Sequence, residues 1–413
     1  MENKKILIST IKAQDGGVAT MLEFVIGVLR KRNYEVTMAY YEPYSITPAL
    51  SVPLIKLLTG AKPKTLNQTF NGCEAIAVGC WLPEFEFTQY LPTKHWKQII
   101  KQHDIHLSVS GSCFAALAYT LVNITARAQT PFLSWTATAW RGDRDHRVRT
   151  FPWLRRLFDR LFVVAQSERL EKKIIRTGNV VALSQYTRKF LNQVADVCDT
   201  SVLTMPIKTH VFCPLSQNEV ARVRQRAFRI GFVGRFEDPR KNISLFLKSA
   251  AKVVQSYPDL EVLLVGDALS DKNLQLLYDL GIQDNVKVME YVERTELPAL
   301  IQTLDIFVLP SHQEGLCIAA LEAMSCAVPI VSTRCGGPED YLHNEENGLF
   351  CDSTVDSMSA AILQLLSDDS TRMRYSKKAR QTVEEQHSFA VVEKQFWTLF
   401  DEKFHENIDK KFD

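Results

Sequence analysis

The chain has 413 residues, more than one ordinary hydrophobic core accommodates, so we expect two domains. Hydrophobic residues make up 46% and charged residues 23% of the sequence, a balance typical of globular proteins and not of disordered or fibrous ones. The formal net charge is +2, from 49 basic and 47 acidic residues, which excludes a general electrostatic attraction to nucleic acid.

The cysteines and the N-terminus indicate the compartment. Nine cysteines are scattered through the sequence, and no two are spaced Cys-x-x-Cys. This pattern argues against a disulfide framework or a zinc site and favours a reducing environment. The first residues, MENKKILIST, lack the apolar stretch of a signal peptide, and no segment reaches the roughly 18 uncharged apolar residues of a spanning helix. We therefore expect a cytoplasmic protein.

Short apolar runs alternate with longer amphipathic runs along the whole chain. Runs that are apolar on both faces are typical of parallel strands covered by helices on both sides. In the first half the expected strands are Lys5–Thr10, Glu35–Tyr41, Cys73–Val78, His106–Ser110, Pro131–Thr136 and Val180–Ser184. In the second half they are Ile230–Gly234, Glu261–Gly266, Val286–Val292, Asp305–Pro310 and Pro329–Thr333.

The strand–helix alternation predicts an α/β protein with two doubly wound, Rossmann-like domains that meet at a cleft. The pattern restarts near residue 229, after a stretch that reads as a linker and a lead-in helix. We expect an N-terminal domain at 1–207, a C-terminal domain at 208–387, and a terminal helix at 388–413 that packs back on the first domain. Ligands of such domains bind at the carboxyl ends of the strands.

The first strand is followed by a pair of glycines, Gly16 and Gly17, where the chain turns into a helix. Glycine lets backbone N–H groups approach a phosphate at a helix N-terminus. The alternative is a tight turn that needs positive φ, and a glycine pair alone does not decide between the two.

The second domain opens with RIGFVGRFEDPRKN. Arg235 and Lys241 follow the strand end at Gly234, six residues apart on a polar loop. Two cations at the mouth of a strand can clamp a pyrophosphate, with lysine as a point charge and arginine as a fork. The alternative is a solvated charged loop.

A third motif, SHQEGLCIAALEAM, places two glutamates eight residues apart in an apolar run. The preceding strand ends at Pro310 and Gly315 interrupts the chain before a helical stretch that ends near Ser325. Glu314 therefore belongs to the loop at the helix entrance, where backbone N–H groups favour negative charge, and Glu322 lies two turns inside the helix. The alternative reading makes Glu314 a helix-start carboxylate and Glu322 an exposed helix residue.

These segments, together with GGVATMLEF and STRCGGPEDYL, resemble the GT-B retaining glycosyltransferases of glycosyltransferase family 4, the glycosyl transferases group 1. The resemblance covers essentially the whole chain, weakly in residues 43–100 and strongly from 229 to 352. It implies a GT-B fold and transfer of a sugar from a nucleotide-diphosphate donor, with the domain at 1–207 binding the acceptor and the domain at 208–387 binding the nucleotide sugar.

The resemblance also implies roles by position. Gly16 and Gly17 match the glycines of the N-terminal domain that face the donor phosphates and the reaction centre. Arg235 and Lys241 match the pair that neutralises the diphosphate leaving group, and with Glu314, which matches the glutamate beside the donor sugar, they form the expected catalytic set.

The remaining matches concern donor binding. Gly315 and Leu316 match backbone amides that approach the sugar and the phosphate. Glu322 matches the glutamate that holds the ribose hydroxyls, and Val292 falls where the family's backbone meets the base. The family has no obvious enzymic nucleophile, so we assign no general base.

Three positions depart from the family pattern. Ala137 stands where the family often has a histidine that contacts the donor sugar, and Glu290 replaces the glycine of the base-binding strand. Cys317 replaces the glycine common after the first glutamate. As a lone cysteine it is interpreted as a small side chain that packs in the interior and not as a reactive thiol.

No metal or other cofactor is expected. Asp143-Arg144-Asp145 has the form of a DxD metal signature, but it lies in an arginine-rich loop where internal ion pairs are the better interpretation. The resemblance likewise implies an enzyme that needs no metal.

Residues 140–162 interleave arginines with aromatic residues, and their leucines follow helical spacing. The pattern suits a helix on an anionic membrane surface and equally a core-packing helix with a solvated basic face. A peripheral contact at the inner face of the membrane, and a lipid-linked acceptor, are the hypotheses that follow.

Together these observations predict a retaining glycosyltransferase with a UDP- or GDP-linked sugar donor. The expected acceptor is the hydroxyl of a glycan, a lipid-linked glycan or cell-surface polysaccharide precursor, or a protein. A sugar-nucleotide epimerase of the same fold and a non-catalytic scaffold subunit remain as alternatives, although a scaffold has no reason to keep both glutamates and both cations.

Overall fold

The computed structural model describes residues 4–11, 16–70, 72–84, 93–112, 130–138, 152–158, 165–216 and 226–409. The chain divides into two compact units. Unit 1 contains Met1–Thr204 and Glu393–Asp413, and unit 2 contains Met205–Val392. The division falls close to the domain boundary that the sequence indicates between residues 207 and 208.

Unit 1 is built on an eight-stranded sheet of order β3-β4-β2-β1-β5-β6-β7-β8, in which only β3 runs antiparallel to its neighbour among the described pairs. Its strands are β1 (Lys5–Ile11), β2 (Glu35–Tyr41), β3 (Thr65–Phe70), β4 (Cys73–Val78), β5 (Ile105–Ser112), β6 (Phe132–Thr138), β7 (Val180–Ala182) and β8 (Ser201–Val202). Its helices are α1 (Gly17–Lys31), η1 (Pro48–Leu50), η2 (Leu54–Thr59), α2 (Lys94–Lys101), α5 (Trp153–Phe158), α6 (Ala165–Ile175) and α7 (Gln185–Ala195).

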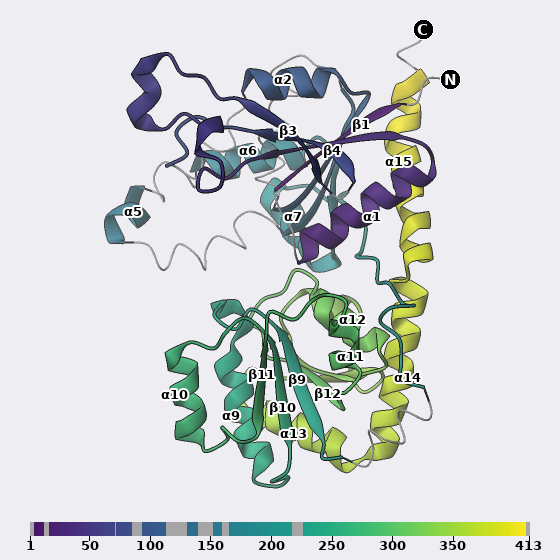
Figure 1. Ribbon diagram of the computed structural model, residues 1–413. Coiled ribbons are helices and arrows are strands. Elements are labelled where there is room, and N and C mark those ends of the chain that lie inside the picture. The colour runs from purple at the N-terminus through teal and green to yellow at the C-terminus, as the bar shows by residue number, and fades with distance from the viewer. Residues whose placement is uncertain are drawn as a thin grey trace. The chain divides into compact units, whose positions relative to one another are not determined.

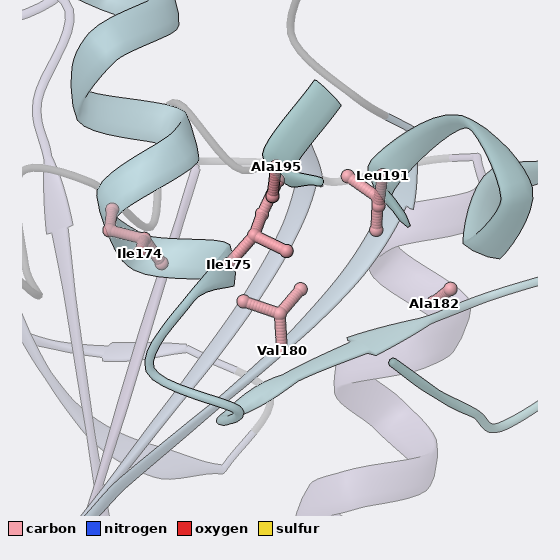
Figure 2. Close-up of a cluster of buried hydrophobic side chains, with 6 residues drawn as sticks. All are labelled: Ile174, Ile175, Val180, Ala182, Leu191 and Ala195. Carbon is pink, nitrogen blue, oxygen red and sulfur yellow. The ribbon is translucent and has the colours of Figure 1, made fainter. Parts of the chain in front are cut away.

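Apolar side chains from helices and strands close the core of unit 1. Figure 2 shows one such cluster, in which α6 and α7 cover β7; its buried members are Ile174, Ile175, Val180, Ala182, Leu191 and Ala195. The terminal helix α15 (Phe389–Asp409) also contributes, because Phe396 packs edge-on against Phe24 of α1 at a centroid distance of 5.8 Å. Burial of such aromatic surface is the main term that holds these helices to the sheet.

Unit 2 has a six-stranded parallel sheet of order β11-β10-β9-β12-β13-β14. Its strands are β9 (Arg229–Gly234), β10 (Glu261–Gly266), β11 (Val286–Glu290), β12 (Ile306–Leu309), β13 (Ile330–Thr333) and β14 (Gly348–Cys351). Its helices are η5 (Pro239–Lys241), α9 (Ile243–Val254), α10 (Asp271–Leu280), α11 (Leu297–Ile301), α12 (Ile318–Ser325), η6 (Gly337–Asp340), α13 (Val355–Ser367) and α14 (Asp369–Gln386). In Figure 1, α9 and α10 lie on one side of this sheet, and α11 and α12 on the other.

The strand order of unit 2 reverses between β9 and β12. The chain moves outward from β9 through β10 to β11, then returns to place β12 on the other side of β9. The carboxyl ends of β9 and β12 therefore mark the topological switch point of this doubly wound sheet, the place where such sheets bind ligands.

Each strand expected from the sequence is present, and the α/β prediction is confirmed. One expected strand end was wrong, and three strands, β3, β8 and β14, were not expected. The strand expected to reach Val292 ends at Glu290, because Tyr291 adopts φ 54°, a left-handed conformation that no strand continues. Strand β3 was missed because its residues, TLNQTF, are polar and exposed, and only apolar runs were taken as strands.

Among the residues that the structure describes, no helix is both long and apolar enough to cross a bilayer.

Candidate functional site

The loop after β9 carries the expected cations. Asp238 opens the short helix η5 and accepts hydrogen bonds from Arg240 at 3.0 and 2.7 Å. Burial alone would raise the pKa of this carboxyl, but the Arg240 guanidinium outweighs it and holds the pKa at about 2. Arg235 contacts the same carboxylate at 3.0 Å with a side chain that is 70% exposed. Asp238 thus orders the loop while the guanidinium of Arg235 stays open to a ligand.

Lys241, at the end of η5, reaches across the switch point to the loop after β12. Its Nζ donates a hydrogen bond of 2.7 Å to Glu314 Oε1, and the Ser311 hydroxyl donates to the same oxygen at 2.7 Å. The Lys241 and Glu314 side chains are only 18% and 8% exposed. Burial lowers the pKa of the Lys241 ammonium, but the neighbouring Glu314 carboxylate outweighs it, so the pKa is raised. The ammonium is therefore a fixed positive charge at the switch point.

Backbone contacts from the loop after β13 hold Glu314 in place. Its N–H donates to the Cys335 carbonyl at 2.7 Å, and its own carbonyl accepts from the Gly337 N–H at 2.9 Å. Gly337 permits this approach because a Cβ there would lie 2.4 Å from the Gly315 oxygen and 2.4 Å from Leu316 Cα. The expectation that Glu314 belongs to a loop is confirmed. The carboxylate of Glu314 contacts Lys241 and Ser311.

The next residues form a turn whose carbonyls are also held. The Tyr341 hydroxyl donates to the Leu316 carbonyl at 2.8 Å and to the Cys317 carbonyl at 3.2 Å. Cys317 adopts φ 64° immediately before α12, a conformation that favours the glycine it replaces. Gly315 and Leu316 therefore lie on a constrained loop that leads to the N-terminus of α12, where the first backbone N–H groups have no partner within the helix.

Glu322 lies inside α12 and is 4% exposed, so the interpretation that it is an exposed helix residue is wrong. Its Oε1 accepts a hydrogen bond of 3.0 Å from Arg294, whose side chain is 47% exposed. Burial raises the pKa of the Glu322 carboxyl to about 7, and Arg294 limits the rise. This carboxyl is a buried acceptor whose charge changes near neutral pH.

Unit 2 thus contains seven of the nine site residues expected from the sequence: Arg235, Lys241, Val292, Glu314, Gly315, Leu316 and Glu322. Val292 is half-buried and follows β11. The structure brings Lys241 and Glu314 into direct contact. Gly16 and Gly17 lie in unit 1, at the start of α1, where Gly16 adopts φ 83° as the turn interpretation requires. Their role toward a phosphate stays a prediction, as do the roles of the other residues.

Three contributors were missed. Ser311 and Tyr341 lie within the quoted motifs but were given no role there, and Arg294 lies outside every motif; all three contact the predicted residues. The only signal was indirect, since a buried carboxylate requires a partner and so implied a cation near Glu322.

Two sequence features lie wholly or largely outside the described residues. Asp143 and Asp145 lie outside the described residues, and only part of the segment 140–162 is described. Within the described part of the chain, no group of three or more His, Cys, Asp and Glu side chains could hold a metal ion.

Comparison with known proteins identifies the family of this region. Residues 217–382 match the family described as glycosyl transferases group 1. A D-inositol 3-phosphate glycosyltransferase of Corynebacterium urealyticum is 32% identical over 161 residues, which are 37% of this chain and 38% of that protein. The lipopolysaccharide core biosynthesis glycosyltransferase LpsE of Rhizobium meliloti is 30% identical over 162 residues, 39% of this chain and 46% of that protein. The chain thus aligns with less than half the length of these relatives.

Solved structures resemble the chain over nearly its full length. Anabaena HepE in complex with UDP superposes with a TM-score of 0.73 at 16% identity, covering 96% of this chain and 100% of that one. Sucrose-phosphate synthase from Thermosynechococcus elongatus gives a TM-score of 0.72 at 17% identity, covering 98% and 100%. At these identities the likeness concerns the fold. The chain is a GT-B protein whose residues 217–382 belong to the glycosyl transferases group 1.

Proposed function

We propose that this protein is a retaining glycosyltransferase that moves a sugar from a UDP- or GDP-linked donor to a hydroxyl acceptor. The observation that carries the proposal is the Lys241–Glu314 pair at the switch point of unit 2, with the exposed Arg235 on the same loop as Lys241. This is where a doubly wound domain binds a nucleotide, and it is where the fixed positive charge lies.

The charges suit cleavage of a sugar–diphosphate bond. Negative charge builds on the leaving diphosphate in the transition state, and preorganised cations stabilise it where they need no reorganisation. In this proposal Lys241 and Arg235 take that role, and the N–H groups at the start of α12 add their partial positive charge. When a phosphate binds, the three N–H donors of the Lys241 ammonium can serve both the phosphate and Glu314.

Glu322 and Arg294 suit the nucleoside half of the donor. An ionised carboxylate can accept hydrogen bonds from both ribose hydroxyls, and Arg294 favours the ionised form. Val292, on the segment after β11, is the proposed backbone neighbour of the base. Glu314 lies toward the donor sugar, and no residue is assigned as general base or nucleophile.

The names of similar proteins support the donor and acceptor classes. HepE was solved with UDP, and a related Mycolicibacterium smegmatis enzyme is a GDP-mannose-dependent mannosyltransferase of phosphatidylinositol monomannoside. LpsE acts in lipopolysaccharide core biosynthesis. We therefore propose a lipid-linked glycan or a cell-surface polysaccharide precursor as acceptor, a location at the cytoplasmic face of the membrane, and no metal requirement.

A screen of UDP- and GDP-sugars with the full chain tests the proposal. A ligand that binds only the folded state raises its apparent stability, so the true donor should raise the melting temperature. With that donor, a transferase releases nucleoside diphosphate faster when a hydroxyl acceptor is added, and the product keeps the anomeric configuration. Conversion of the donor sugar without acceptor would indicate an epimerase, and absence of both reactions a scaffold.

A further inference from the structure

Unit 1 carries an apolar surface that the donor site does not explain. All seven residues from 54 to 60 are exposed. On η2, Leu58 is 98% and Ile55 is 86% exposed, and Leu54 and Leu57 are 57% and 42% exposed. Large aliphatic side chains so fully in water are rare singly, and a group of them marks an interaction surface. We call the segment 54–64 the η2 surface.

The geometry of η2 concentrates these side chains. In a 3₁₀-helix, residues three apart lie directly above one another. Ile55 and Leu58 therefore share one edge of η2, and Leu54 and Leu57 share the neighbouring edge. The result is an aliphatic ridge at the tip of the segment.

The segment is held in this exposed position by its base. Val52 N–H donates to the Cys80 carbonyl at 3.0 Å, and the Val52 carbonyl accepts from the Leu82 N–H at 2.8 Å. At the other end, Lys64 N–H donates to the Leu50 carbonyl at 2.8 Å. Both ends are thus fixed to ordered backbone, so the exposure of the ridge is a built feature of the fold.

The side chains that η2 and the residues after it contribute are predominantly basic, while one carboxylate, that of the exposed Glu84, accepts a hydrogen bond of 2.9 Å from the Leu54 N–H at the base of the ridge. Lys56, Lys62 and Lys64 are all exposed, and the sequence contains no acidic residue between Glu42 and Glu74. A ridge of aliphatic side chains flanked by lysines is the pattern of segments that lie in the interface of an anionic bilayer, where lysine stems reach up to the headgroups.

Helix α5 repeats this chemistry in the same unit. Trp153 is 67% and Leu157 is 49% exposed, and Arg156 between them is exposed as well. In Figure 1, α5 and the coil of η2 project from the same side of unit 1. Tryptophan and arginine are residues that favour the bilayer interface.

We propose that the η2 surface docks unit 1 on an anionic phospholipid bilayer, with Ile55 and Leu58 entering the headgroup–acyl boundary and the three lysines contacting lipid phosphates. A second copy of the chain is the less suitable occupant, because two η2 surfaces would bring six exposed lysines together against only the two Glu84 carboxylates at their bases. The inference rests on the proposed function for the membrane location and deepens it by naming the surface that makes the contact; vesicle binding and donor binding are measured separately, so either can fail alone.

Flotation with lipid vesicles tests it. The full chain is mixed with phosphatidylcholine vesicles, alone or with about one third phosphatidylglycerol. The wild-type protein should float with the anionic vesicles and much less with the neutral ones, and added salt should release it. The double variant Ile55→Ser/Leu58→Ser should bind at least tenfold more weakly, and Lys56→Ser/Lys62→Ser/Lys64→Ser should lose the preference for anionic lipid.

The matched control is Leu274→Ser/Tyr278→Ser, which removes two exposed side chains, 41% and 66% exposed, from α10 of unit 2. It should leave flotation unchanged. Melting temperatures confirm that each variant is folded, which the exposure of all the altered residues favours. Unchanged flotation of Ile55→Ser/Leu58→Ser overturns the proposal, and so does a loss of dimer by light scattering in that variant without a loss of vesicle binding.

Discussion

The two units share a doubly wound architecture but place different chemistry on their sheets. In unit 2, charged side chains gather at the carboxyl edge, where Lys241 meets Glu314 and Glu322 meets Arg294. In unit 1, the central strands carry buried hydroxyls instead, with Ser9, Ser108 and Ser134 paired across β1, β5 and β6. The difference shows that one fold can gather charged groups in one half while the other half carries neutral groups inside and an aliphatic surface outside.

The largest effect is expected from the ion pair of unit 2. Lys241→Ala and Glu314→Ala should each lower sugar transfer by about 10²–10³-fold, the effect of removing one preorganised group that stabilises the transition state. Glu314→Ala should also reduce the free energy of unfolding by about 3 kcal/mol, because it leaves a mostly buried ammonium without its partner. Initial rates and urea unfolding measure the two effects.

The control in unit 1 is Lys31→Ala, which removes an exposed pair with Glu393 at 2.9 Å. Exposed pairs contribute little, so neither rate nor stability should change appreciably. Equal losses of transfer rate in the Lys241→Ala and Lys31→Ala variants would contradict the distinction between the two units.

Two glycines sharpen the comparison in opposite directions. Gly337→Ala places a Cβ 2.4 Å from the Gly315 oxygen, so it should displace the loop of unit 2, cost about 1–3 kcal/mol of stability and raise the KM for donor. Gly27→Ala, inside α1 of unit 1, meets no atom within 4 Å and should stabilise by about 0.5–1 kcal/mol. Thermal unfolding of both variants measures these changes in stability. Stabilisation by Gly337→Ala would contradict the close approach of Gly337 to the Gly315 carbonyl.

Glu322 should make the stability of unit 2 depend on pH. Its pKa is about 7 in the folded protein against a usual 4.5, so between these values the folded state holds a proton that the unfolded chain has lost. The contribution of Glu322 to the free energy of unfolding therefore falls as pH rises through this window, by up to about 3 kcal/mol. Glu322→Gln should be relatively more stable at pH 8 than at pH 5.

The same substitution separates stability from binding. If Glu322 holds the ribose, wild-type affinity for donor should decline below about pH 7 as the carboxyl takes up a proton, and Glu322→Gln should bind donor weakly at every pH. A pH-independent affinity in the wild type would argue against this role. Calorimetric titrations between pH 5 and pH 8 provide the comparison.

The smallest effect concerns the Tyr341 hydroxyl. Tyr341→Phe removes its hydrogen bonds to the Leu316 and Cys317 carbonyls, which should cost about 1 kcal/mol and raise the KM for donor a few-fold with little change in kcat. Tyr278→Phe, at a side chain 66% exposed on α10, is the control and should behave as the wild type. A large fall in kcat for Tyr341→Phe would mean that the hydroxyl does more than hold the loop.

The sequence predicted the parts of this protein that depend on local pattern. Apolar runs located most strands of both sheets, although β3, β8 and β14 were missed, and Gly315 separated the loop with Glu314 from the helix with Glu322. The contact between Lys241 and Glu314 was not predictable, because it joins loops 73 residues apart that only the strand order brings together. Arg294 is a similar case, since its pairing with Glu322 follows from the path of the chain after β11.

Exposure was the property least accessible from sequence. The run PLIKLLTG in residues 53–60 has the composition of a buried segment, yet residues 54–60 all face water. Conversely, the charged Glu322 is buried because α12 is covered on nearly all sides, which its neighbours Ala320, Leu321, Ala323 and Met324 reflect. Burial depends on tertiary packing, and composition alone cannot assign it.

Titration calorimetry with UDP and GDP tests the central claim most directly, that the switch point of unit 2 binds a nucleoside diphosphate. We expect one site per chain for UDP or GDP, with binding at least tenfold weaker in Lys241→Ala, less weakened in the exposed Arg235→Ala, and unchanged in Lys31→Ala. Binding of neither nucleotide to the wild-type chain, or equal binding to wild type and Lys241→Ala, would contradict it.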